Sequence, residues 1–177
     1  MKTQYKFTRA LTAAFATAAI STAALAAGPT ECGLIGTWLG QEANDMTWLG
    51  VHTAGSAATK GVMQMNWVYV NPGLRGAEYN LTPGVGSWEQ TGRGQYNYAW
   101  YAYGIDKLSG EPAYSVRVSG TATNETCDKV NITYVYEIYY PMVAPSDMSL
   151  TNVNLVDIKV GTASETRVPL TVVTLPN

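Results

Sequence analysis

Residues Val130 to Tyr140 read VNITYVYEIYY, and two kinds of side chain alternate along the whole stretch. One face of the extended chain carries Val130, Ile132, Tyr134, Tyr136 and Ile138, and the other carries Asn131, Thr133, Val135, Glu137 and Tyr139. A period of two residues indicates a β-strand that buries one face, and Val, Ile, Thr and Tyr are residues that pleated strands favour. This stretch predicts a strand and makes an all-β fold the first expectation.

The same alternation recurs along the rest of the chain. It covers Val62–Val70, Gly94–Tyr103 and Tyr114–Ala122, and the tail adds one or two strands over Val153–Val160 and Thr166–Val173. Turn-forming pairs such as Ser109-Gly110 separate these runs, and such short connections favour antiparallel pairing. We therefore predict a single antiparallel barrel of roughly eight strands, with a β-sandwich as the alternative.

The first 26 residues have the features of a secretory leader. Lys2, Lys6 and Arg9 precede an apolar run from Leu11 to Leu25, and Ala24-Leu25-Ala26 matches the small-residue pattern of a cleavage site. A membrane span needs about 20 apolar residues, so we expect no membrane insertion. The expected organisation is a signal peptide over residues 1–26 and one β-barrel domain over residues 27–177, located in the bacterial periplasm or secreted.

The charge of the mature chain argues against a nucleic-acid partner. Removal of the three basic leader residues from the 11 Lys and Arg leaves eight, against 13 Asp and Glu, which is a net charge of −5. Nucleic acids and anionic lipids attract clustered Lys and Arg. We therefore expect a small-molecule partner. The oligomeric state is not defined by these features, although a monomer is compatible with them.

The cysteine content predicts a disulfide. Cys32 and Cys127 are the two cysteines of the chain, and both follow the leader. In an oxidising compartment a single pair of cysteines is most simply a disulfide. We therefore expect Cys32 and Cys127 to be bonded rather than to act as catalytic thiols.

The segment Cys32–Gly40, CGLIGTWLG, resembles the first strand of the calycins, the lipocalin and avidin-like barrels. Those folds begin with Gly-x-Trp, matched here by Gly36 and Trp38. Their last strand brings an Arg over that Trp at the barrel base, and Arg167 lies in the corresponding place. The resemblance implies a lipocalin-like barrel in which these three residues are structural. An Arg over an indole face contributes about 0.5–2 kcal/mol while its donors reach backbone carbonyls.

Aromatic residues supply the main functional hypothesis. The chain has five Trp and 12 Tyr, whereas its two Phe, Phe7 and Phe15, both lie in the leader. Trp and Tyr combine an apolar body with a polar tip, and barrel mouths are frequent ligand sites. We predict a small, partly apolar or aromatic ligand in a Trp/Tyr-lined cavity. The candidate ligand-binding residues are Trp67, Tyr69, Tyr96, Tyr98, Trp100, Tyr134 and Tyr136; the alternative is that these rings only form the core.

Catalytic residues are not identified by any motif, and the candidates are Glu137, Arg117 and His52. Our default expectation for Glu137 is an ion pair with Arg117 across neighbouring strands, whereas an inward-facing Glu137 would be a general acid or base. His52 is the single histidine, which argues against a triad or a multi-histidine metal site. We expect it in a loop or at a strand end on the surface rather than as a lone general base. No metal and no cofactor are predicted.

Two further functions remain as alternatives. One is a cofactor-free lyase, isomerase or cyclase in the same barrel, which requires Glu137 and Arg117 inside it. The other is a carbohydrate-binding or interaction module, which requires aromatic side chains aligned on the outer surface. The sequence favours binding over catalysis.

Overall fold

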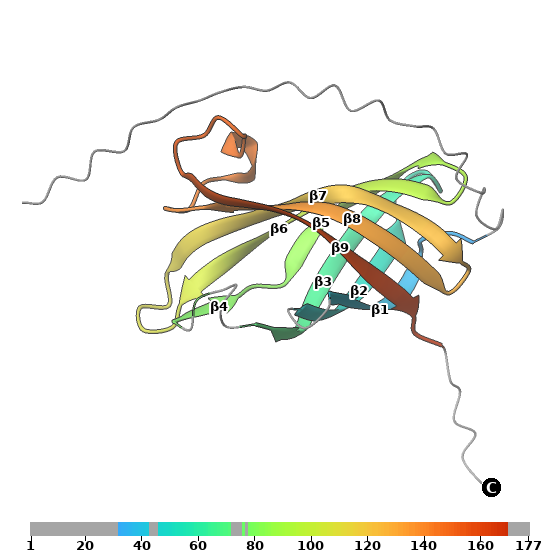
Figure 1. Ribbon diagram of the computed structural model, residues 1–177, viewed down its shortest axis with the longest axis horizontal. Coiled ribbons are helices and arrows are strands. Elements are labelled where there is room, and N and C mark those ends of the chain that lie inside the picture. Colours follow the sequence, from blue (N-terminus) through green and yellow to red (C-terminus); the bar gives the residue numbers. More distant parts are fainter. Residues whose placement is uncertain (1–31, 43–45, 72–75, 77, 170–177) are drawn as a thin grey trace, which may run out of the picture.

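The computed structural model describes residues 32–42, 46–71, 76 and 78–169, which form nine β-strands and one short 3-10 helix (Figure 1). The strands are β1 (Gly36–Glu42), β2 (Met46–Ala54), β3 (Lys60–Val70), β4 (Tyr79–Leu81), β5 (Gly84–Gly92), β6 (Gln95–Asp106), β7 (Pro112–Thr126), β8 (Lys129–Tyr139) and β9 (Leu155–Arg167); the helix η1 spans Pro145–Asp147. The predicted leader lies outside the described residues. Among the described residues, no helix is both long and apolar enough to span a membrane.

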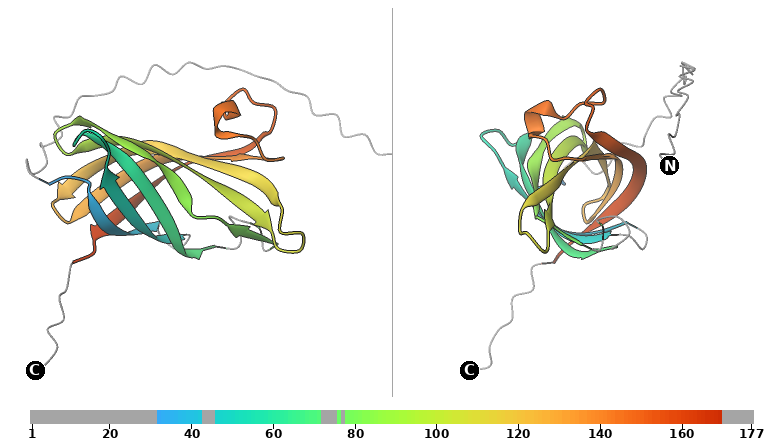
Figure 2. Two further views of the ribbon diagram at one scale, coloured as in Figure 1. Left: turned by 180° about the vertical axis from the view of Figure 1, so that it is seen from behind. Right: turned by 90° about the vertical axis from the view of Figure 1, so that its left-hand side faces the viewer.

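Eight of the strands close into an antiparallel barrel, which Figure 2 shows end-on as a ring. The barrel strands pair with their neighbours in chain order from β1 to β9, leaving out β4, and β9 returns to pair with β1. The short β4 pairs with one end of β6. The preceding part of β6 pairs with β5. The prediction of an eight-stranded antiparallel barrel is confirmed, and the sandwich alternative is excluded.

The alternation in the sequence correctly predicts which side chains fill the barrel. On β8, Val130, Ile132, Tyr134 and Tyr136 are buried, as are Tyr96, Tyr98 and Trp100 on β6. Inward-facing rings and aliphatic side chains form one continuous core. The tail, for which one or two strands were expected, forms the single strand β9, which also covers the residues between the two predicted runs. Residues 170–173 of the second predicted strand lie outside the described residues.

The end of the barrel has the arrangement that the calycin resemblance implied. The Arg167 guanidinium lies 4.2 Å from the centre of the Trp38 ring and donates hydrogen bonds to the carbonyls of Gly33, Ile35 and Cys127. Gly36 has φ +140°, and a Cβ there would lie 2.5 Å from Arg167 Nη1. The glycine of the Gly-x-Trp motif is therefore required by both backbone conformation and space.

The predicted disulfide is confirmed. Cys32 and Cys127 are bonded, with 4.9 Å between their Cα atoms. The bond joins the segment before β1 to the turn between β7 and β8. The Tyr96 hydroxyl and the Asn124 amide both donate to the Cys32 carbonyl, at 3.1 and 2.6 Å, and they fix this segment against the barrel end.

Tyrosine ionisation provides a test of this buried core. Burial raises the pKa of Tyr98 and of Tyr136 far above the usual range, and burial followed by the hydrogen bond to Glu137 raises the pKa of Tyr139 to about 12. Tyrosine in an unfolded chain ionises at about pH 10. Because the folded pKa values are higher, these residues contribute stability that is fully present below about pH 10 and is lost as the pH rises through the folded values.

We therefore expect an alkaline titration, followed by tyrosinate absorbance, to show two phases. Exposed tyrosines should ionise at about pH 10. The buried tyrosines Tyr98, Tyr136 and Tyr139 should ionise only at higher pH, together with loss of the β-sheet signal in circular dichroism. In guanidinium chloride a single phase is expected. A single phase at about pH 10 with the strands still folded would contradict the described burial.

Candidate binding site inside the barrel

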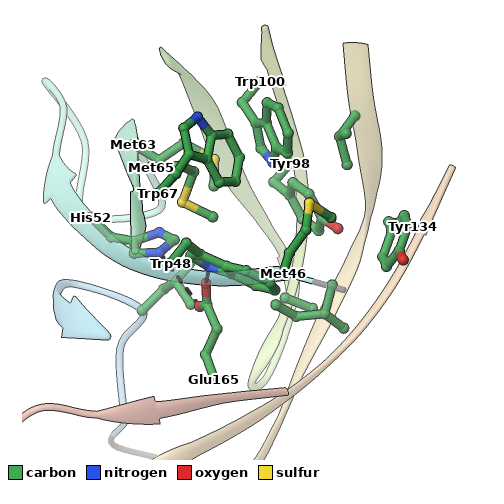
Figure 3. A pocket seen from close by; sticks show the side chains of 14 residues that line it. Met46, Trp48, His52, Met63, Met65, Trp67, Tyr98, Trp100, Tyr134 and Glu165 are labelled. Carbon is green, nitrogen blue, oxygen red and sulfur yellow. Dashed lines mark hydrogen bonds and ion pairs between the residues drawn. The ribbon is translucent and has the colours of Figure 1, made fainter. Parts of the chain in front are cut away.

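The interior of the barrel contains a small, mostly apolar cavity (Figure 3). Its volume is about 30 Å³, which has room for one or two water molecules. Aromatic rings, methionines and two ionisable groups dominate its lining. These are Trp48, Trp67, Tyr98, Trp100 and Tyr134, then Met46, Met63 and Met65, then His52 and Glu165.

The strand β2 supplies the floor of the cavity because every second residue points inward. Met46, Trp48, Gly50 and His52 are all buried, and the residues between them are partly exposed. Gly50 keeps the centre of the floor open, since a Cβ there would lie 3.1–3.3 Å from atoms of His52, Met65 and Glu165. A side chain at position 50 would therefore press directly on the two ionisable groups.

Trp48 is positioned by a glycine and a carboxylate. A Cβ on Gly40 would lie 2.0 Å from the Trp48 ring, so the indole packs directly against the β1 backbone. The Trp48 N–H donates a 2.7 Å hydrogen bond to Glu165 Oε1. Glu165 comes from β9 and is only 1% exposed. Figure 3 shows its carboxylate rising from β9 toward Trp48.

His52 lies beside this carboxylate without bonding to it. Its Nε2 is 3.6 Å from Glu165 Oε2, which is longer than a hydrogen bond, and the side chain is 3% exposed. Neither imidazole nitrogen has a hydrogen-bond partner in the described part of the chain. Buried polar atoms are usually paired, so this group has unused hydrogen-bonding capacity that faces the cavity.

Aromatic rings form the opposite wall. The ring centres of Trp67 and Trp100 are 5.2 Å apart with their planes inclined at 55°, and the Trp67 N–H donates to the Thr82 carbonyl at 2.6 Å. Tyr134 donates to the carboxylate of Glu42. The pKa of Tyr98 is raised by burial and then by the nearby charge of Glu165. The cavity therefore combines rigid apolar walls with a negative field.

The structure brings together four of the seven predicted ligand-binding residues, namely Trp67, Tyr98, Trp100 and Tyr134. Tyr136 is buried on the same face of β8 but is not among the cavity residues. Tyr96 lies at the disulfide end, where it bonds to Cys32. Tyr69 is 48% exposed, because β3 continues past its pairing with β5 and its register with β2 shifts next to Trp48.

The catalytic candidates do not meet in one place. Arg117 and Glu137 form the expected ion pair, with Nε to Oε2 at 2.5 Å and Nη2 to Oε1 at 2.8 Å. Both residues lie on the face opposite to the inward-facing Val116 and Tyr136, and the Met148 carbonyl of the segment after β8 accepts a hydrogen bond from Arg117 there. Glu137 is therefore buried without facing the cavity, and an inward-facing acid or base at this position is excluded.

The expected surface position of His52 is wrong. The histidine lies on the inward face of β2, the same face as Met46 and Trp48, and is buried inside the barrel. Within the described residues, no group of three or more His, Cys, Asp or Glu is placed to hold a metal ion.

Glu165 is the main residue that the sequence analysis missed. A usable signal was present, because residues two apart on a strand share a face and Arg167 was expected to lie over Trp38 at the barrel base. The Met46-x-Trp48-x-x-x-His52 pattern was a second signal, since it places the methionine, the indole and the imidazole on one face. The three cavity methionines carried no signal that distinguished them from ordinary core residues.

Comparison with known proteins assigns no family. No family model matches the chain, and no curated protein sequence matches it. Among solved structures, the barrel is similar to a biotin-binding protein from chicken, with 13% sequence identity and a TM-score of 0.48. That match covers 80% of this chain and 100% of the chicken chain.

Proposed function

We propose that this chain is an exported β-barrel protein that binds a small, partly apolar ligand in its interior cavity. The observation that carries the proposal is the composition of the cavity wall. Five aromatic rings and three methionines enclose a buried carboxylate and an imidazole with unused hydrogen-bonding atoms. Ligand sites in proteins are mostly apolar with a few polar groups that fix orientation, and this cavity has that composition.

Methionine side chains allow the cavity to enlarge. A volume of about 30 Å³ is smaller than an aromatic ring requires. Met46, Met63 and Met65 each have three rotatable bonds and a polarisable sulfur, so they can rotate aside and then pack against a ligand. The ligand is therefore small, and it enters by displacing methionine side chains rather than by filling a preformed chamber.

Export rests on the leader and is supported by the disulfide. Disulfides persist in oxidising compartments such as the periplasm or the medium. We propose that cleavage after Ala26 leaves one barrel domain over residues 27–177. The bond between Cys32 and Cys127 would then form after translocation.

The two alternative functions have less support. The lyase, isomerase or cyclase hypothesis relied on Glu137 and Arg117, which lie on the outer wall. The carbohydrate-module hypothesis needs aligned surface aromatics. The exposed large aromatics among the described residues are Tyr69 and Tyr140, which belong to separate strand ends, whereas most Trp and Tyr side chains are buried.

A matched pair of variants on β3 tests the cavity. Trp67 lines the cavity against Trp100, and Tyr69, two residues further along, is exposed. We expect Trp67→Leu to weaken binding of benzyl alcohol, used as a small neutral probe, by about two- to tenfold, because an aromatic contact contributes about 0.5–1.5 kcal/mol. Tyr69→Leu should leave the affinity unchanged.

Ligand-observed NMR titration at constant protein concentration measures both affinities. Circular dichroism before each titration confirms that both variants are folded. Equal affinities for Trp67→Leu and the parent protein would place the probe outside this cavity and contradict the proposal.

A further inference from the structure

Glu165 is a buried carboxylate with too few donors. Its Oε1 accepts from Trp48, and among the described residues the imidazole of His52 lies beside Oε2, at 3.6 Å, within ion-pair distance but beyond hydrogen-bond distance. An ionised carboxylate that is removed from water is costly unless it is paired and hydrogen-bonded. Among the described residues, Oε2 therefore receives no hydrogen bond.

The cationic side chains on the same strand do not supply this donor. Arg167 is two residues away, but its guanidinium is committed to the carbonyls of Gly33, Ile35 and Cys127 and lies over Trp38. Lys159 is half-exposed and lies 3.5 Å from Asp157. Within the described residues, neither cation forms a salt bridge with Glu165. The carboxylate, which lines the cavity, is thus paired with neither of these two cations.

The remaining wall is suited to a cation that carries an apolar body. Indole faces attract ammonium groups, and this attraction is stronger at desolvated sites. Trp48 lies beside Glu165, and Trp67 and Trp100 line the opposite wall of the same cavity (Figure 3). The same negative field that disfavours ionisation of Tyr98 favours a positive charge at this position.

We propose that the ligand is a small organic ammonium compound whose N–H donates to Glu165 Oε2. Its apolar body packs against the tryptophans and the three methionines. This inference rests on the proposed binding function and names the ligand class for the same cavity. It disfavours fatty acids and other carboxylates, because Glu165 would repel them at close range without water to screen the charges.

Three probes of similar size and different charge test the inference. Benzylammonium is positive, benzyl alcohol is neutral and benzoate is negative at pH 7. We expect the parent protein to bind benzylammonium about tenfold more tightly than benzyl alcohol, and benzoate more weakly than either, as a charge-assisted hydrogen bond implies. Isothermal titration calorimetry or ligand-observed NMR measures the three affinities.

Glu165→Gln is the decisive variant because it removes the charge and retains an oxygen that accepts from Trp48. We expect it to lose the tenfold preference for benzylammonium while keeping its affinity for benzyl alcohol. Glu89→Gln is the matched control. Glu89 is 54% exposed on the outer face and pairs with Lys60, so its neutralisation should leave all three affinities unchanged.

The possible outcomes separate the two proposals. Equal binding of benzylammonium and benzyl alcohol by the parent protein would overturn the ammonium inference and leave the binding function standing. Absence of binding by all three probes would overturn both. If Glu165→Gln does not fold, the order of affinities in the parent protein still decides, and benzoate binding as tightly as benzylammonium would overturn the inference.

Discussion

Arg117→Met is expected to lower the free energy of unfolding by about 3–5 kcal/mol, because it leaves a buried carboxylate without its counter-charge. Glu137 is 3% exposed and receives two hydrogen bonds from Arg117 and one from the Tyr139 hydroxyl at 2.8 Å. Arg117 also donates to the Met148 carbonyl and ties the segment between β8 and β9 to the barrel wall. The variant removes both the ion pair and this attachment.

Urea unfolding followed by tryptophan fluorescence measures the loss. Lys60→Met is the matched control, because its pair with Glu89 is exposed on both sides and should contribute at most about 1 kcal/mol. The double variant Arg117→Met/Glu137→Met should recover much of the stability, since it leaves no unpaired charge. Similar midpoints for Arg117→Met and Lys60→Met would contradict the buried ion pair.

Removal of the disulfide is the second large effect. The bond closes a loop of 95 residues between Cys32 and Cys127, so its loss should cost about 4–5 kcal/mol through the greater entropy of the unfolded chain. The double variant Cys32→Ser/Cys127→Ser avoids a free thiol.

Urea unfolding of the double variant, compared with the oxidised parent protein, measures this cost. A loss below about 1 kcal/mol would show that the bond does not constrain the unfolded chain as its loop length implies. The parent protein treated with a reductant should unfold at the same urea concentration as the double variant. A large difference between them would assign part of the effect to the serine substitutions.

Local patterns were sufficient to predict the barrel. Alternation identified the inward faces of β6, β7 and β8, and the Gly36-x-Trp38 motif with Arg167 predicted how the barrel end is closed. These predictions succeeded because a strand residue's face depends only on its parity along the strand. The pairing of Cys32 with Cys127 followed from there being no other cysteine.

The candidate site was predicted less completely. Alternation along a strand tells which face a side chain lies on, but not how deeply other parts of the protein bury it. Tyr69 shares parity with Met65 and Trp67, yet a register shift and the end of pairing with β5 leave it exposed. Glu137 was placed on the polar face, but there it is buried and paired with Arg117, which also bonds to the Met148 carbonyl of the segment that follows β8. Such cover depends on how residues 140–154 fold back, which no local pattern encodes.

The most direct test of the account uses the methionines as reporters. Met46, Met63 and Met65 line the cavity, whereas Met142 is 42% exposed and Met148 is buried outside that lining. We expect carbon-13 methyl spectra of methionine-labelled protein, titrated with benzylammonium, to show saturable shifts of the three cavity methionines with one common dissociation constant. Met142 and Met148 should not move. Unchanged cavity resonances, or shifts confined to Met142, would contradict ligand binding inside the barrel.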